Sequence, residues 1–216
     1  MTPEDVRPHL VAVNVGVARD VPWGRLRRSA FDKRPVRGRA RVGTLGLAGD
    51  EQADRANHGG PVKALLVHAV EDLQEWADAL GRELPPGSFG ENLTTRGLDV
   101  TDARIGERWR VGSALVEVAS VRTPCAVFAG FTGEPQWVRQ FTHRGRPGAY
   151  LRVLEPGELG AGDDVQVVER RDHDVTVGLM FRAITSERHL LPRLLEEERA
   201  DPEAHRGARR YLADGP

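Results

Sequence analysis

Residues 105–125, IGERWRVGSALVEVASVRTPC, contain the clearest fold signal in the chain. Within residues 104–121, two segments that favour strands flank Gly112-Ser113, a pair typical of a tight hairpin turn. The second segment alternates along its length, with Ala114, Val116 and Val118 on one face and Leu115, Glu117 and Ala119 on the other. The pattern predicts an antiparallel hairpin that runs directly into the turn Arg122-Thr-Pro-Cys125.

Further strands are expected on both sides of this hairpin. They cover residues 9–17, 38–48, 63–68, 149–155 and 164–169. Apolar residues at helical spacing predict one amphipathic helix over residues 70–80, which ends at Gly81. The expected fold class is therefore mainly β with a few helices, and the β-rich body spans residues 1–171.

Residues 172–216 differ in character and predict a small segment of three helices. Asp174 and Ser186 can each cap a helix, and Asp201-Pro202 combines a cap with proline at the first helical position. The chain therefore divides, by prediction, into a body over residues 1–171 and a helical tail over residues 172–216.

Composition excludes several classes of protein. The 216 residues contain 31 basic and 32 acidic side chains, so no partner among nucleic acids or membrane surfaces is expected. One cysteine, Cys125, rules out a disulfide framework and multi-cysteine zinc sites. With no signal-peptide pattern and no apolar run of spanning length, a cytoplasmic protein is expected. Of the basic residues only Lys33 and Lys63 are lysines, which makes each lysine more informative.

The polar stretch over residues 49–60, GDEQADRANHGG, is too long for a simple turn. It is either a solvated loop or a functional one, with Asp50, Asp54 and His58 as candidate catalytic groups. Gly59-Gly60 lets a ligand approach the backbone. Lys63 follows at the start of an apolar strand, where its charge suits an anion or a salt bridge at the strand end.

Two further candidates lie beside predicted strands. In Phe89-Gly-Glu91-Asn92-Leu93, Asn92 offers donors and an acceptor for the edge of a heterocycle, although a plain turn into a strand explains the segment too. Cys125 is either a small buried apolar residue or a thiolate favoured by nearby positive charge such as that of Arg122.

Four segments in this order and spacing, GDEQADRANHGGPVKAL, SFGENLTTRGLDV, IGERWRVGSALVEVASVRTPC and GAYLRVLEPGELGAGDDV, resemble the MOSC domain of molybdenum cofactor sulfurases and of the mitochondrial amidoxime-reducing components. Within that family the chain is most similar to the standalone bacterial type, in which a "3-alpha" domain follows MOSC. The resemblance implies a β-barrel body with a few helices and a small C-terminal three-helix segment.

The resemblance also implies a molybdenum–pterin cofactor (Moco), with Cys125 as the one protein thiolate that binds the metal. Arg122 and Thr123 would flank the cofactor, and Asn92 and Tyr150 would contact it. Lys63 and His58 would meet the cofactor's phosphate or the substrate.

The implied reaction is reduction of an N-hydroxylated small molecule, such as a hydroxylaminopurine or an amidoxime, from N–OH to N–H. Asp50, Asp54, Glu91 or His58 would deliver protons. A single cysteine cannot hold an iron–sulfur cluster and no flavin or haem segment is visible, so an external flavoprotein-type electron donor is implied. The helical tail would dock that donor, cover the barrel or form a homodimer.

Two other functions remain open at this point. The chain could be a non-catalytic carrier of the pterin cofactor, or of sulfur relayed through Cys125. Alternatively, Lys63 could bind pyridoxal phosphate, because MOSC domains adjoin domains that use this cofactor in the sulfurases.

Overall fold

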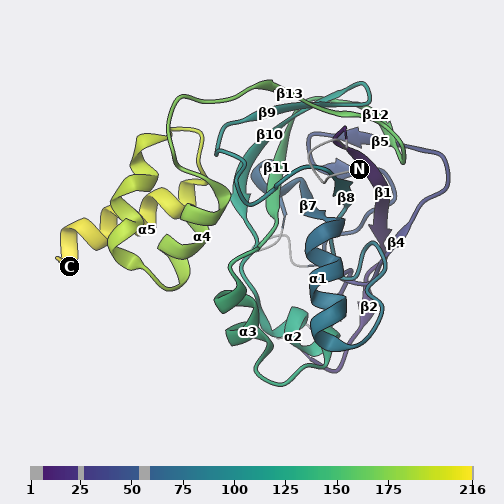
Figure 1. Cartoon of the computed structure of the whole chain (residues 1–216), viewed down its shortest axis with the longest axis horizontal. Helices are drawn as coiled ribbons and strands as arrows, with labels where there is room; N and C mark the ends of the chain where they lie inside the picture. The colour runs from purple at the N-terminus through teal and green to yellow at the C-terminus, as the bar shows by residue number, and fades with distance from the viewer. Residues whose placement is uncertain (1–6, 24–26, 54–58, 216) are drawn as a thin grey trace.

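The computed structural model describes residues 7–23, 27–53 and 59–215, and a sheet of eight strands is its largest element (Figure 1). In spatial order the strands are β13 (Val165–Glu169), β9 (Arg108–Val111), β10 (Ala114–Val121), β11 (Ala149–Glu155), β7 (Leu65–Ala69), β8 (Leu93–Arg96), β1 (His9–Gly16) and β4 (Lys33–Pro35). The predicted hairpin is confirmed, since Val111 of β9 pairs with Ala114 of β10 across the Gly112-Ser113 turn.

Two smaller sheets complete the β structure. One contains β12 (Gly157–Gly160), β5 (Arg39–Gly43) and β6 (Gly46–Leu47), and the other contains β2 (Arg19–Asp20) and β3 (Arg28–Ser29). The single strand expected over residues 38–48 is thus a short hairpin. Its second strand starts at Gly46. The positive φ of 122° there suits glycine, and a Cβ at this position would lie 2.7 Å from the carbonyl oxygen of Ala64. Between the expected strands over residues 149–155 and 164–169 lies a further strand, β12, which pairs with β5 far along the chain.

The named strands of the described residues form no closed ladder, but β1, the neighbour of the edge strand β4, meets the segment that leads into β13. The Leu10 N–H donates to the Asp163 carbonyl oxygen at 2.8 Å, and the Val165 N–H donates to the Pro8 carbonyl oxygen at 2.8 Å. An isolated bridge joins His9 and Asp164 between them. The mainly β class is confirmed. Among the described residues, the expected barrel is a sheet in which a few backbone bonds join the start of β1 to the start of β13.

Helix α1 (Val70–Leu80) matches the predicted amphipathic helix and ends at Gly81 in the left-handed conformation. Two further helices, α2 (Ala126–Thr132) and α3 (Trp137–Arg144), follow Cys125 and lie near α1 in Figure 1. They were not expected, because each is only about two turns long and carries few periodic positions. Their formation depends on packing: Phe128 and Trp137, both almost fully buried, pack edge to face with their ring centroids 5.1 Å apart.

The tail contains α4 (Val177–Thr185), the 3-10 helix η3 (Arg188–Glu196) and α5 (Pro202–Asp214), beside the sheet in Figure 1. Asp201 caps α5 as predicted, accepting a bond from the Glu203 N–H at 2.9 Å. The other two caps differ: Thr176 rather than Asp174 caps α4, and η3 begins after Glu187 without a side-chain cap. The division into two domains at residue 171 stays a prediction.

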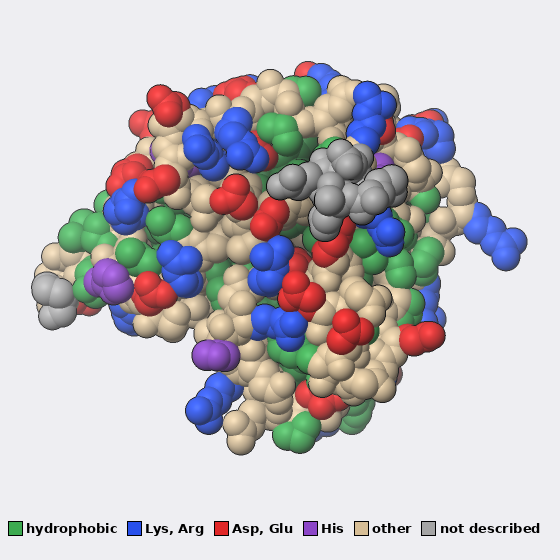
Figure 2. All heavy atoms as spheres, viewed as in Figure 1, with side chains coloured by type: hydrophobic (Ala, Val, Ile, Leu, Met, Phe, Trp, Pro, Cys, Tyr) green, Lys and Arg blue, Asp and Glu red, His purple; other side chains and the backbone are tan. Residues whose placement is uncertain are grey.

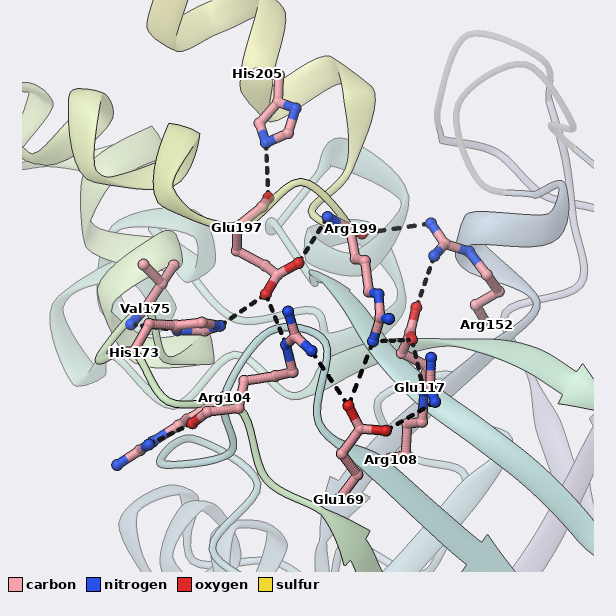
Figure 3. A network of polar contacts seen from close by, with 11 residues as sticks. Arg104, Arg108, Glu117, Arg152, Glu169, His173, Val175, Glu197, Arg199 and His205 are labelled. Atoms are coloured by element: carbon pink, nitrogen blue, oxygen red, sulfur yellow. Dashed lines mark hydrogen bonds and ion pairs between the residues drawn. The ribbon is translucent and has the colours of Figure 1, made fainter.

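A network of arginines and carboxylates joins the tail to the sheet (Figure 3). Glu117 of β10, with its side chain only 2% exposed, accepts hydrogen bonds from three arginines. These are Arg152 at 2.7 Å, Arg108 at 3.1 Å and Arg199 at 3.4 Å. Glu197, also 2% exposed, contacts His173 at 2.9 Å and Arg171 at 3.2 Å. The outer face of β10 is therefore buried under the tail by paired charges.

The face in Figure 2 shows acidic and basic side chains interspersed, in keeping with the near-zero net charge of the chain. Among the helices of the described residues, none combines the length and the apolar character that a membrane crossing requires.

Candidate functional site

A pocket of about 320 Å³ opens between the large sheet and the loops that connect its strands. Its volume falls in the range of about 300–1,000 Å³ that is usual for small-molecule and cofactor sites. Six residues proposed from the sequence line it together: Asp50, Lys63, Asn92, Arg122, Cys125 and Tyr150. They come from positions spread over a hundred residues of sequence, so the fold gathers them.

Cys125 lies at the end of β10, where the chain turns into α2. Its Sγ is 3.9 Å from Nη2 of Arg122, whose side chain is almost fully buried. Nη1 of the same guanidinium donates to the Tyr150 hydroxyl at 2.9 Å, which ties β10 to β11. A fixed cation beside the sulfur favours the thiolate form, in which cysteine binds metals and attacks electrophiles.

The Arg122 guanidinium is held mainly by aromatic rings. Its Cζ lies 5.4 Å from the ring centre of Phe31 and 5.3 Å from that of Phe128. Its Nε is buried and has no hydrogen-bond partner in the described residues. Burial acts to lower the pKa of this group, but Tyr150 and Cys125 outweigh that effect and raise it. The pocket therefore contains a permanent cation with hydrogen-bonding capacity left over.

A second cation, Lys33, forms an ion pair with Asp50 on the same pocket wall. Asp50 Oδ1 also accepts the backbone N–H of Gly16 at 2.7 Å, and its Oδ2 accepts Asn92 Nδ2 at 2.9 Å. Burial lowers the pKa of Lys33, although Asp50 opposes that shift.

Asn92 connects strands besides contacting Asp50. Its Oδ1 accepts the Leu66 N–H at 3.1 Å, and its Nδ2 also donates to the Asn14 carbonyl oxygen at 3.2 Å. The amide hydrogens of Asn92 are therefore engaged within the protein. This geometry favours a role in positioning Asp50 over direct donation to a ligand.

Lys63 joins the pocket to the tail. It ends the 3-10 turn η2 (Pro61–Lys63), and its Nζ lies 3.8 Å from an Asp201 oxygen and 3.5 Å from a Glu203 oxygen at the start of α5. Its ammonium also lies 6.0 Å from the ring centre of Tyr150. The pocket and the first turn of α5 therefore share one electrostatic neighbourhood.

Of the four remaining predicted site residues, two do not line the pocket and two lie outside the described residues. Glu91 is fully buried and accepts the N–H groups of Gly87 and Phe89 at 2.6 and 3.0 Å, so it shapes the turn before β8 and does not line the pocket. Thr123 is exposed and is not part of the pocket wall. Asp54 and His58 lie outside the described residues.

Lys33 has no role that is predicted from the sequence. Its segment has no periodicity, and its place beside Asp50 depends on the pairing of β4 with β1. The available signal was the scarcity of lysine, because both lysines of the chain line the same pocket.

Comparison with known proteins identifies the class. The MOSC domain matches residues 54–166, slightly more than half of the chain. The chain belongs to the MOSC domain family, which is the family of the C-terminal domain of molybdenum cofactor sulfurases.

Individual relatives support the same assignment. The uncharacterized protein YflK of Bacillus subtilis is 33% identical over 79% of this chain and 78% of its own length. The protein YiiM of Escherichia coli is 34% identical over 77% of this chain and 75% of its own length. The crystal structure of YiiM from Geobacillus stearothermophilus superposes with a TM-score of 0.80 at 25% identity, covering 95% of this chain and 99% of that one. A Gibberella moniliformis protein named "Reductase" is 29% identical over 72% of this chain, but only 30% of that protein is matched.

Proposed function

We propose that this protein binds a molybdenum–pterin cofactor in the pocket and reduces N-hydroxylated small molecules there, converting N–OH to N–H and water. One observation carries the proposal: the only thiol of the chain lines a pocket whose wall also holds five cationic side chains. The cations are Arg27, Arg28, Lys33, Lys63 and Arg122, against the two acids Asp50 and Glu51.

The donor set fits such a cofactor. A cofactor that brings its own dithiolene needs one soft protein ligand, and Cys125 is a soft ligand at the pocket wall. The cofactor's phosphate needs fixed positive charge, which Arg122 and Lys63 supply. Among the described residues, the buried Nε of Arg122 has no hydrogen-bond partner, so this guanidinium has a further donor that is unused.

Each pocket residue then has a definite task. Cys125 would hold the metal as thiolate, Arg122 would keep the sulfur ionised, and Tyr150 would fix the orientation of Arg122 through the bond at 2.9 Å. Lys63 would neutralise cofactor charge from the side of α5. When bound, the cofactor would supply the two electrons of the reduction.

Membership of the MOSC family and the relative named "Reductase" support an oxidoreductase. The N-hydroxylated substrate and the external flavoprotein-type electron donor are parts of the proposal, as is docking of that donor, or of a second copy, on the helical tail. Asp50 is the described pocket acid that remains a candidate for moving protons. Asp50 forms an ion pair with Lys33, so the two residues would take part in proton transfer together.

The test uses protein produced in a molybdenum-replete host. We expect stoichiometric molybdenum and pterin in the wild type and turnover of a benzamidoxime or hydroxylaminopurine with a chemical reductant. Protein that loads and releases the cofactor without any turnover would instead be a carrier. Absence of molybdenum from the wild type would refute the cofactor assignment itself.

A further inference from the structure

Lys33 is held in an enclosed position on the pocket wall. Its side chain is 9% exposed and that of its partner Asp50 is 3% exposed, yet both residues line the pocket. Asp50 is in turn fixed by the Gly16 N–H at 2.7 Å and by Asn92 at 2.9 Å. The ammonium group is therefore anchored, through Asp50, to the end of β1 and to the residue before β8, with little freedom to move.

The Lys33 ammonium has protons to give. It carries three N–H bonds, and within the described part of the chain Asp50 is the acceptor of one of them. The charged groups that act on it are Asp50 and Glu91, which raise its pKa, and Arg122, which lowers it. Burial outweighs the carboxylates, so the pKa of Lys33 is shifted down towards the range in which an ammonium is an efficient acid.

The other described pocket groups are less suited to this task. Arginine does not release its proton in proteins, which excludes Arg122. The Glu51 carboxylate is an acceptor that already takes the Ala18 N–H at 2.7 Å, and the Tyr150 hydroxyl is fixed in place as the partner of Arg122. Lys63 is more exposed and is shared between two carboxylates of α5.

We propose that Lys33 is the general acid of the pocket: it protonates the oxygen that leaves when the N–O bond of the substrate is reduced. The proposal rests on the proposed function. In the step, R–NH–OH takes up two electrons from the reduced molybdenum–pterin cofactor and the N–O bond breaks. The Lys33 proton and the departing hydroxide form water, a second proton from solvent completes R–NH₂, and Lys33 is reprotonated from solvent. Asp50 is the positioning residue that holds the ammonium in place.

The first readout does not need turnover. Because the chain has only two lysines, ¹³C-lysine labelling yields two side-chain signals, and Lys63→Arg assigns them. We expect the Lys33 signal to titrate below the ordinary lysine value of 10.5, because burial lowers the pKa of this group. A Lys33 signal that titrates like an exposed lysine would overturn the proposal.

The second readout uses cofactor-loaded protein. Lys33→Met should lower kcat by about 100-fold or more at unchanged molybdenum content. The loss of rate at high pH that we expect of the wild type should vanish in this variant. Small alkylammonium ions should restore part of the rate in Lys33→Ala, which a purely structural role would not permit. Arg34→Met, the exposed neighbour on β4, is the matched control and should keep wild-type rates.

The outcomes separate the two proposals. Wild-type turnover with a Lys33→Met rate within threefold of it refutes Lys33 as the acid and leaves the proposed function standing. Loaded wild-type protein that reduces no N-hydroxylated compound refutes the proposed function and the acid role with it, whatever the lysine titration shows. If Lys33→Met does not fold, Lys33→Arg, which keeps the charge but not the transferable proton, takes its place and should show the same loss of rate.

Discussion

The pocket and the network between β10 and the tail both bury carboxylates against cations, but they use different cations. Asp50 in the pocket pairs with a lysine, whereas Glu117 in the network pairs with three arginines. Arginine binds carboxylates through a rigid fork and stays charged, while lysine is a point charge that titrates readily when buried. The chain has 29 arginines and two lysines, and both lysines line the pocket. The comparison indicates that the network fixes structure and that the pocket is arranged for chemistry.

Cys125→Ser should give the largest effect, a loss of molybdenum content and turnover with little change in the stability of the fold. A hydroxyl is a poor ligand for a metal that favours thiolate, so we expect molybdenum content and turnover to fall to background while the free energy of unfolding changes by less than about 1 kcal/mol. Metal analysis and urea unfolding of the same preparations check both parts. Unchanged molybdenum loading would remove Cys125 from the site.

Acid should destabilise the sheet at His68 of β7 before it affects the network. His68 is fully buried beside Arg122, and both of its ring nitrogens are without partners in the described residues. Burial, assisted by the charge of Arg122, lowers its pKa from 6.5 to about 3. Below pH 6.5 the imidazole therefore binds a proton in the unfolded chain, whereas in the folded chain it stays neutral until the pH approaches 3. Stability is full above pH 6.5 and is lost as pH falls towards 3, by up to about 5 kcal/mol.

The network loses stability only at lower pH. The pKa of Glu197 is lowered, because its bonds to Arg199 and Arg171 outweigh burial, so its contribution is lost below its ordinary value of about 4.5. Urea unfolding of His68→Leu between pH 7 and 4 should consequently show a flatter profile than the wild type. His143→Leu, at an exposed histidine of α3, should leave the profile unchanged. A wild-type profile that is already flat above pH 4.5 would contradict the assignment to His68.

Glu117→Gln should break the network and spare the pocket. The neutral amide would leave three arginines without their shared carboxylate, at a cost of about 3 kcal/mol, near the lower end for breaking a buried pair because the arginines are partly exposed. Glu155→Gln, which breaks the exposed pair with Arg110, should cost less than about 1 kcal/mol. Equal losses in the free energy of unfolding of the two variants would show that the burial of Glu117 adds nothing to the strength of its ion pairs.

Asp201→Asn should produce the smallest effect. It changes a residue at the start of α5 in the tail, and the effect is measured in the pocket. The amide oxygen can still cap α5, but the negative charge beside Lys63 disappears. We expect the affinity of the pocket for inorganic phosphate to rise about twofold to fivefold, corresponding to a partly exposed ion pair. Isothermal titration calorimetry measures the change. Glu203→Gln, at the more exposed carboxylate near Lys63, should have a weaker effect, and equal affinities in all three proteins would separate the tail from the pocket electrostatically.

The elements of the fold that depend on local sequence pattern were predictable. The β9–β10 hairpin, α1 with its Gly81 terminus and the Asp201 cap depend on neighbours in sequence, so their signals survive in the chain alone. Strand β12 and helices α2 and α3 were not predictable in this way, because a four-residue strand and two-turn helices gain their stability from partners far along the chain.

By itself the sequence determined the residue types of the site and their family resemblance: a single thiol beside Arg122, Asn92 after a turn, and lysine used only twice. Only the tertiary structure decided which of these groups meet. It brought Lys33 to Asp50 by pairing β4 with β1, and it enclosed Glu91 in a turn away from the pocket. The reason is that composition and spacing record local preferences, whereas burial and charge pairing arise between segments that only the folded sheet places side by side.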